Sequence, residues 1–290
     1  MKVGLFTIVK NEHSYLEEWV QYHLNPLLGI HQIYIFDDPF SKPHDEICNR
    51  FPKDRVIHQN ILSMYPKSWQ EKILNRTDYK ETTIPRQLRY MFTVLEYFKS
   101  KHIFDWVFYL DSDEFLTLAD NEKESIPDIL NAYKDYDILS VSWKNYGASG
   151  HLNRPDGGVI ENYTIECPVY VGSMSTNASS KLCFNLNRWN STRIRSNHHL
   201  VFKGKWCKTN FSKDSKELVY DRLYIRHYIT KSLEEFVSKV LFRGQFFGSK
   251  TINSFFLFNK DINKNDPEVQ KVINKYRDMY YSGEVKFSIF

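Results

Sequence analysis

Residues 106–116 read WVFYLDSDEFL, an apolar run that ends in three acids within four positions. The run has the length and the aromatic and β-branched content of a buried strand. Asp111 and Asp113 are two positions apart, so their carboxylates point to the same side in extended backbone. Adjacent negative charges need a cation or a shared proton, and carboxylate oxygens suit Mg²⁺ and Mn²⁺. The stretch therefore predicts either a divalent-metal site after a buried strand or a solvated acidic turn.

The flanking sequence alternates between predicted strands and predicted helices, which is typical of an α/β fold. The first strand is apolar on both faces, as in a parallel sheet covered by helices. A capping box at Ser14 and Glu17 predicts the start of the first helix, and Pro26 predicts its end. We expect strands at residues 2–9, 32–36, 56–59, 106–110 and 138–143, and helices at residues 14–27, 45–51, 85–98 and 126–133.

Acidic residues follow three of these strands. Glu12 follows the first, Asp37 and Asp38 the second, and Asp111 with Asp113 a later one. If the strands are parallel, these acids lie along one edge of the sheet, where open α/β sheets bind ligands. Such an edge can hold the base and ribose of a nucleotide at one end and a metal-bound diphosphate at the other.

Two regions are less regular. Residues 60–83 are polar and are predicted to form a long loop, of the kind that makes lids, binding loops or disordered segments. Residues 167–213 contain no Asp or Glu but many Lys and Arg, together with His198 and His199. This basic stretch indicates either a solvated surface or a wall that faces an anionic ligand or lipid.

The C-terminal part predicts a strand at residues 224–228 and a helix that a capping box at Ser232 and Glu235 begins. A last helix is expected at residues 267–281. We predict one catalytic domain at residues 1–245, followed by a C-terminal helical extension at residues 246–290.

Composition limits the function classes. The chain has 290 residues and a formal net charge of +4, so it does not demand a nucleic-acid partner. Its four cysteines lack C-x-x-C spacing, which favours reduced thiols in a cytoplasmic protein. The apolar start, residues 3–9, is too short for a signal peptide or membrane span. The sequence has no P-loop, no G-x-G-x-x-G, no H-E-x-x-H and no G-x-S-x-G.

Several sequence blocks, in order, carry a resemblance to a known family: residues 8–12, 18–23, 34–38, 106–116, 143–151, Lys181, His198-His199 and residues 227–236. Together they resemble glycosyltransferase family 92 and the related family-2-like glycosyltransferases, from about residue 3 to residue 244. The resemblance implies a GT-A fold, a Rossmann-like α/β fold of nucleotide-diphospho-sugar transferases. It also implies transfer of a sugar, galactose or another hexose, from a UDP-sugar donor to a glycan or glycolipid acceptor.

The resemblance further implies Mn²⁺ or Mg²⁺ as cofactor, with Asp111, Asp113 and His227 as metal ligands. Asp111 would bind the metal through water or hold the ribose. Lys231 would contact the diphosphate together with the N-terminus of the helix that follows it. For His227 the alternative is a histidine whose hydrogen bonds are satisfied in the core.

Other site residues follow from the same resemblance. Asn11, Glu12 and Asp37 would meet the uracil and ribose. Trp143 and Tyr146 would stack on the acceptor sugar, unless they pack in the core. An inverting transfer also needs a general base within reach of the acceptor hydroxyl.

For that base we expect Glu161 or His199; Asp156, Glu166 and Glu114 are the remaining candidates. The expected setting is synthesis of a bacterial surface polysaccharide or lipooligosaccharide. The protein would be cytoplasmic, with possible peripheral contact at the inner membrane surface.

Two other functions compete with transfer. In a phosphatase or phosphotransferase, Asp111 would be the nucleophile, but such enzymes usually carry the acid pair on their first strand, followed by Thr or Val where Phe115 stands here. The other is a non-catalytic nucleotide- or carbohydrate-binding protein. The intact acids and the His227–Lys231 segment favour the enzyme.

Overall fold

The computed structural model describes residues 1–78, 85–120, 122–168, 170–171, 174–175, 180–189, 206–208, 220, 222–243 and 252–282. The chain divides into two compact units. The first consists of Met1–Trp143 with Ser179–Ile225, and the second of Lys144–Ala178 with Arg226–Phe290.

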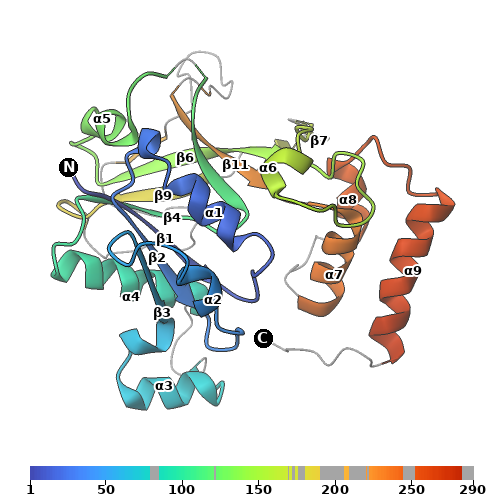
Figure 1. The fold of residues 1–290 in the computed structure, drawn as a ribbon, viewed down its shortest axis with the longest axis horizontal. Coiled ribbons are helices and arrows are strands. Elements are labelled where there is room, and N and C mark those ends of the chain that lie inside the picture. The colour runs from blue at the N-terminus through green and yellow to red at the C-terminus, as the bar shows by residue number, and fades with distance from the viewer. Residues whose placement is uncertain are drawn as a thin grey trace. The chain divides into compact units, whose positions relative to one another are not determined.

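Four parallel strands organise the first unit (Figure 1). β1 (Val3–Val9) pairs with β2 (Gln32–Asp37) on one side and with β4 (Trp106–Tyr109) on the other. β3 (Val56–Asn60) pairs with β2. The carboxyl ends of β1, β2 and β4 therefore share one edge, which confirms the predicted α/β class and the parallel, Rossmann-like half that a GT-A fold requires.

The sheet continues beyond β4 with mixed direction. β9 (Ser180–Asn185) is antiparallel to both β4 and β6 (Ile138–Tyr146). β11 (Leu223–Tyr228) and β5 (Glu114–Leu118) follow, and β10 (Trp206–Lys208) also pairs with β6. The sequence did not predict β5 or β9.

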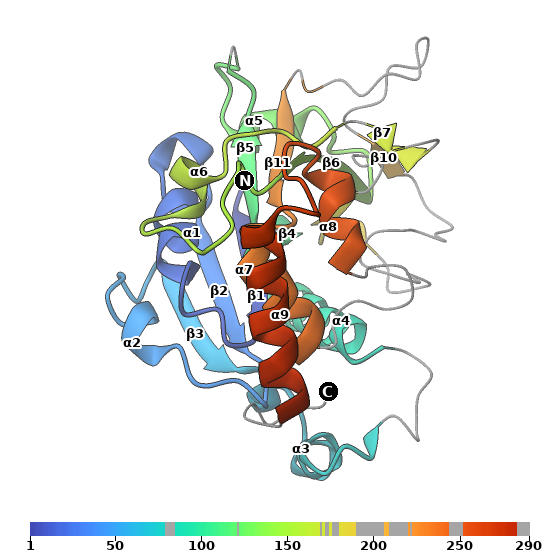
Figure 2. The same ribbon diagram turned by 90° about the vertical axis from the view of Figure 1, so that its right-hand side faces the viewer.

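Helices cover the parallel strands: Figure 2 shows α1 (Leu16–His23) and α2 (Asp45–Cys48) on one side and α4 (Arg86–Ser100) on the other. The apolar stripe of α4 packs against Phe6 and Tyr109 of the sheet. The shorter helices of this unit are η1 (Pro26–Leu28), η2 (Ile61–Met64), α3 (Lys67–Leu74) and α5 (Ile126–Asn131). Because η2 and α3 lie within residues 60–83, the prediction of one irregular loop there was wrong.

The predicted start of α1 was also wrong. The helix begins at Leu16 with Tyr15 as its N-cap residue, and no side chain caps it. Glu17, which was expected to complete a capping box, instead pairs with Arg50 at 2.6 Å. The chain leaves α1 at Leu24, and Pro26 opens η1 instead of lengthening the helix.

Helix α1 is tied to β5 by two buried side chains. The indole Nε1 of Trp19 donates to the carbonyl of Glu114 at 2.8 Å. The backbone N–H of Leu116 donates to Nε2 of His23 at 3.0 Å, and Nδ1–H of His23 donates to the carbonyl of Trp19 at 2.8 Å. These bonds fix the backbone that directly follows the acids at residues 111–114.

The second unit has its own core. α7 (Leu233–Arg243), α8 (Ile252–Phe258) and α9 (Pro267–Ser282) bury Phe236, Phe255 and Ile273 together with Ala148. The second unit also contains α6 (Val159–Asn162) and the hairpin of β7 (Tyr170–Val171) and β8 (Met174–Ser175). The C-terminal helices thus share a core with Ala148 and Leu152, and the domain boundary expected at residue 245 stays a prediction. Among the described helices, none combines the length and apolarity that a membrane span requires.

We predict that His23 makes folding stability depend on pH. Burial lowers its pKa to about 3, so between that value and 6.5 the unfolded chain binds a proton that the folded chain does not. Stability should therefore fall as the pH drops below about 6.5, and His23→Gln should weaken this dependence. Urea unfolding at pH 7.5 and pH 5 measures it. If the free energy of unfolding falls by the same amount from pH 7.5 to pH 5 in wild type and variant, the prediction is wrong.

Candidate functional site

The acids after β4 form a closed turn. The Oε2 of Glu114 accepts the backbone N–H of Asp111 at 2.8 Å, and the N–H of Glu114 donates to the carbonyl of Asp111 at 3.1 Å. Glu114 is fully buried, Asp113 is 9% exposed, and the carboxyl group of Asp111 is about one-third exposed. The turn therefore presents Asp111 at the carboxyl edge of the sheet.

Lys181 supplies a cation beneath this turn. Its buried Nζ lies 2.6 Å from Oδ2 of Asp111 and 3.4 Å from Oε2 of Glu114. Burial alone would lower the pKa of Lys181, but the two carboxylates raise it above its usual value. Burial raises the pKa of Glu114 well above its usual value. The closest ion pair of this turn is therefore that of Lys181 with Asp111.

Two further side chains border Asp111. Nε2 of Gln87 donates to the hydroxyl of Tyr109 at 2.8 Å and lies 3.5 Å from Oδ1 of Asp111. The ring of Tyr109 lies below the ammonium of Lys181, 5.1 Å from Nζ to the ring centroid. Gln87 comes from the first turn of α4, so three elements position one carboxylate.

The loops after β1 and β2 bind one another. The backbone N–H of Asn11 donates to Oγ of Ser41 at 2.9 Å, and its side-chain Oδ1 accepts the N–H of Lys42 at 3.0 Å. Asn11 has φ of 56°, a left-handed conformation that asparagine tolerates better than most residues. Asn11 and Glu12 thus lie at the predicted edge, close to the chain that follows Asp37.

Asp37 is oriented by two histidines that the sequence did not indicate. Its carboxylate accepts from His44 at 2.5 Å and lies 2.8 Å from Nε2 of His58. His44 Nε2 in turn accepts the backbone N–H of Glu12 at 3.1 Å. Burial raises the pKa of Asp37, but the hydrogen bonds from the two histidines outweigh it and lower the pKa to about 2. Asp37 supports the loop after β1, and its contact with a nucleotide stays a prediction.

Arginines not singled out in the sequence lie beside Asp38. The guanidinium groups of Arg76 and Arg86 lie over the ring of Phe40, at 4.6 and 5.6 Å from its centroid. Asp38 accepts the N–H of Phe40 at 2.9 Å, and burial raises its pKa although Lys10, Arg86 and Arg76 act against this. This end of the sheet edge therefore carries cations, and Arg86 among them pairs with the buried carboxylate of Asp78 at 2.8 Å.

The second unit holds the remaining predicted residues that the structure describes, apart from Trp143, which belongs to the first unit. Nδ1 of His227, which is 8% exposed, bonds to Oδ1 of Asn145 at 2.8 Å. Since an amide oxygen only accepts, Nδ1 carries the proton and Nε2 carries the lone pair. The predicted capping box at the start of α7 is confirmed, because Ser232 and Glu235 bond reciprocally. Lys231 precedes it with φ of 53°.

The expected base and acceptor residues have local structural roles. Oε1 of Glu161 accepts the N–H of Gly158 at 2.8 Å and so caps its own helix, α6. Trp143 and Tyr146 are buried residues, 9% and 8% exposed, and the ring of Tyr146 lies 5.3 Å from that of Tyr228, centroid to centroid. Their roles stay predictions. His199 and most of the basic stretch lie outside the described residues.

The donor chemistry at residues 111–113 fits a hard divalent cation. Mg²⁺ and Mn²⁺ use one or two carboxylates and complete their shell with water and phosphate oxygens. Among the side chains that the structure describes, no three of His, Cys, Asp and Glu cluster in a metal-binding arrangement. Asp111 and Asp113 belong to the first unit and His227 to the second, so the three-residue ligand set stays a prediction.

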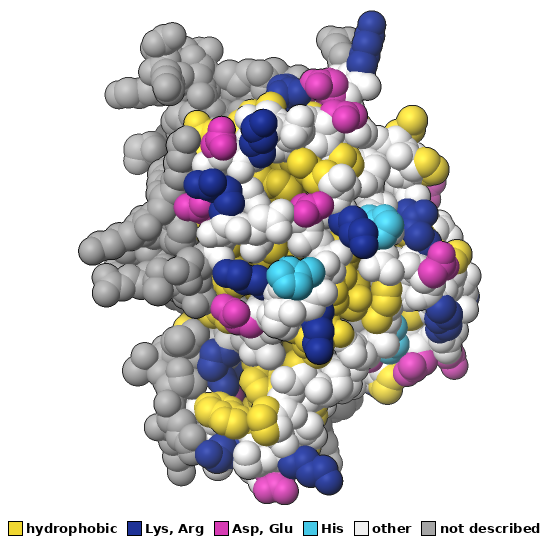
Figure 3. Space-filling model, turned by 90° about the vertical axis from the view of Figure 1, so that its left-hand side faces the viewer, with side chains coloured by type: hydrophobic (Ala, Val, Ile, Leu, Met, Phe, Trp, Pro, Cys, Tyr) yellow, Lys and Arg dark blue, Asp and Glu magenta, His cyan; other side chains and the backbone are white. Residues whose placement is uncertain are grey.

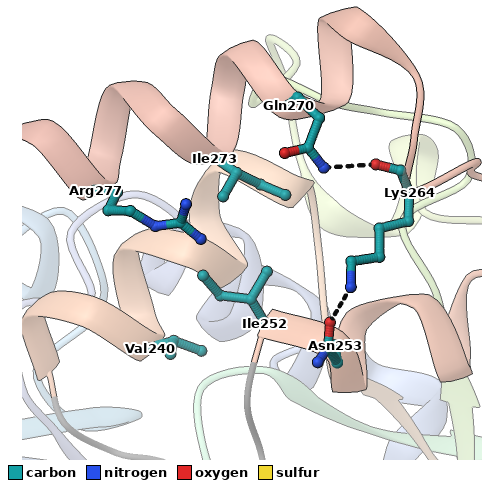
Figure 4. A pocket seen from close by; sticks show the side chains of 7 residues that line it. All are labelled: Val240, Ile252, Asn253, Lys264, Gln270, Ile273 and Arg277. Atoms are coloured by element: carbon teal, nitrogen blue, oxygen red, sulfur yellow. Dashed lines mark hydrogen bonds between the residues drawn. The ribbon is translucent and has the colours of Figure 1, made fainter.

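The described surface has two further features. On the face in Figure 3, coloured basic and acidic side chains are interspersed instead of gathered by sign. A pocket of about 490 Å³ lies in the second unit (Figure 4). There Nζ of Lys264 donates to Oδ1 of Asn253 at 2.6 Å, and Gln270 donates to the Lys264 carbonyl at 2.7 Å. The predicted site residues do not line this pocket.

Comparison with known proteins gives a family match. The model of glycosyltransferase family 92 matches residues 7–273. A family 92 protein of Ricinus communis is 24% identical over 238 residues, 80% of this chain and 36% of that protein. One of Oryza sativa subsp. japonica is 22% identical over 161 residues, 54% of this chain and 24% of that protein. The chain therefore spans 24–36% of the length of these relatives.

Solved structures give only distant likenesses. A fragment of Staphylococcus aureus TarS in complex with UDP has 13% identity and a TM-score of 0.33, covering 97% of this chain and 72% of that one. Glucosyl-3-phosphoglycerate synthase of Mycobacterium tuberculosis with Mg²⁺ and UDP has 14% identity and a TM-score of 0.33, covering 64% and 57%.

We predict that His58 stabilises the protein more in acid than in base. Its hydrogen bond to Asp37 raises its pKa above 6.5, so its contribution is complete below about pH 6.5 and is lost as the pH rises through the raised value. His58→Gln should cost about 1–2 kcal/mol at pH 6 and less at pH 9. Urea midpoints at both pH values test this; a cost that grows with pH would refute it.

Proposed function

The chain belongs to glycosyltransferase family 92, and from that premise we propose that it transfers a sugar from a nucleoside-diphosphate donor to a hydroxyl acceptor. One observation carries the proposal: the turn that bears Asp111 and Asp113 directly follows β4, at the edge where β1 and β2 also end. Open α/β sheets bind ligands at such an edge.

The donor in this proposal is UDP-linked, with galactose or another hexose as the sugar. The support is the resemblance of the sequence blocks, together with the arrangement of the edge. Asn11 and Glu12 lie at the β1 end, and Asp38 with Arg76 and Arg86 lies at the β2 end. The polar groups at the β1 and β2 ends would meet the base and ribose, and the acidic turn after β4 would meet the diphosphate.

Asp111 and Asp113 would hold Mn²⁺ or Mg²⁺ with the diphosphate. When bound, the metal supplies positive charge that stabilises the departing nucleoside diphosphate. The residues of the chain align the donor: Glu114 and Gln87 orient Asp111, and the closed turn sets the spacing of the two carboxylates.

His227 is proposed as a further metal ligand and Lys231 as a phosphate ligand. The bond from Nδ1 of His227 to Asn145 supports this, because it leaves the lone pair on Nε2. Metal-binding histidines commonly have such a second partner, which fixes the tautomer. Lys231 would act through its charge alone.

For an inverting transfer, Glu161 and His199 are retained as candidate bases. The side chain of Glu161 is exposed to solvent, whereas that of Glu114 is fully buried. The carboxylate of Glu166 pairs with Lys144 at 2.5 Å, so Glu166 is a weaker candidate for the base. Asp156 is retained with them.

The cellular setting is proposed more broadly. A role in bacterial surface polysaccharide or lipooligosaccharide synthesis, from the cytoplasmic side of the inner membrane, was expected from the sequence. The family 92 relatives from Ricinus communis and Oryza sativa are plant proteins, so we keep the expected acceptor class, a glycan or glycolipid, without restricting it to bacteria.

We predict that Asp113→Ala lowers donor turnover at least about 100-fold while the protein stays folded, because it removes a charge that holds the metal and leaves the apolar core unchanged. Release of UDP from UDP-hexoses with Mn²⁺ measures this. Asp120→Ala, a change at an exposed acid just past β5, is the matched control and should be active. Near-normal turnover by Asp113→Ala in the presence of a chelator would exclude the metal mechanism.

We also predict that UDP with Mn²⁺ raises the melting temperature, since a ligand that binds only the folded state stabilises it by RT ln(1 + [L]/Kd). The shift should be several degrees at saturating UDP and smaller when EDTA replaces Mn²⁺. Thermal melts with UDP, GDP, CDP and TDP measure it. If none of the four shifts the transition, the nucleotide-sugar function fails.

A further inference from the structure

Lys181 is an unusual residue for its position. Its side chain is fully buried, and burial of an ammonium group costs several kcal/mol unless charged partners compensate it. Its partners are the carboxylates of Asp111 and Glu114, at 2.6 and 3.4 Å. The ammonium group of Lys181 therefore lies against the acidic turn that the proposed function assigns to the metal.

The fold explains how Lys181 reaches this turn. β9 runs antiparallel to β4, with Cys183 opposite Phe108. Two residues earlier on β9 correspond to two residues later on β4, which places Lys181 beside Leu110. A residue 70 positions away in sequence thus lies directly below Asp111.

The bond to Lys181 has two consequences for Asp111. It fixes one carboxylate oxygen, Oδ2, and so the rotamer of the side chain. It also balances the negative charge of Asp111 inside the protein. A divalent cation that approaches the turn is attracted by the carboxylates and repelled by the ammonium of Lys181. The repulsion is felt because the ammonium lies 2.6 Å from the carboxylate of Asp111.

We propose that Lys181 is a positioning residue that aligns Asp111 and weakens the affinity of the acidic turn for a free divalent cation, so that the cation binds together with the nucleoside diphosphate instead of before it. This inference rests on the proposed function. The diphosphate brings negative charge of its own, which restores the attraction that Lys181 removes.

A purely structural role for Lys181 predicts something different. If the ammonium only holds the turn in shape, its loss leaves Asp111 less ordered, and Mn²⁺ binding becomes weaker or stays unchanged. If it also opposes the cation, its loss makes Mn²⁺ binding tighter. The sign of the change separates the two roles.

The test compares Lys181→Gln, which keeps a hydrogen-bond donor but removes the charge, with Lys181→Arg, which keeps the charge. Mn²⁺ is titrated into the full chain, with and without UDP, and electron paramagnetic resonance measures the free Mn²⁺. Thermal melts check that each variant is folded. Without UDP, Lys181→Gln should bind Mn²⁺ on the order of tenfold more tightly than wild type, and Lys181→Arg within about twofold of it. The factor by which UDP tightens Mn²⁺ binding should fall in Lys181→Gln.

Equal or weaker Mn²⁺ binding by Lys181→Gln overturns the proposal. If this variant does not fold, Lys181→Met replaces the stem with an apolar chain of similar length and tests the same sign. Asp113→Asn serves as the control for the site and should weaken Mn²⁺ binding in every background. Absence of Mn²⁺ binding by wild type even with UDP overturns the metal-dependent function itself, whereas intact binding that Lys181→Gln leaves unchanged overturns only the role of Lys181.

Discussion

A buried positive charge at the end of β4 is the constraint on which the site depends. Three acids within four residues can lie together at the edge of an apolar sheet only if a cation or a bound proton compensates their charge. Lys181 supplies that cation from β9, while Trp19 and His23 of α1 hold the backbone of β5 on the far side of the turn. Two distant parts of the chain thus determine the geometry of one short turn.

The parallel half of the fold was predictable because its signals are local. β1, β2, β3 and β4 each appear in the sequence as short apolar runs, and the observed strands agree with the predicted ones within one or two residues. β9 was missed because its pairing partners, β4 and β6, are separated from it by long stretches of chain. α3 was missed because its sequence is largely polar and only Ile73 is fully buried.

The candidate site was predictable to the same extent. Asp111, Asp113, Asp37 and Glu12 were identified because each follows a strand that the pattern itself predicts. Their partners were not, because no local pattern connects His44 and His58 with Asp37. Lys181 was noticed as a residue in family order and as part of the basic stretch, and its contact with Asp111 depends on the antiparallel register of β9. Local patterns thus indicated which acids belong to the edge, and long-range packing determined which of them are oriented by a partner.

The path of β9 also bears on how the protein folds. This strand lies between β4 and β6, which come earlier in the chain, so the middle of the sheet cannot close until residues 180–185 have been added. Contacts across 70 or more residues require closure of a long loop, which slows folding. Until then the acids after β4 lack their ammonium partner and repel one another. The binding edge should therefore be among the last parts of the molecule to form, and a growing chain on the ribosome cannot assemble it before β9 has emerged.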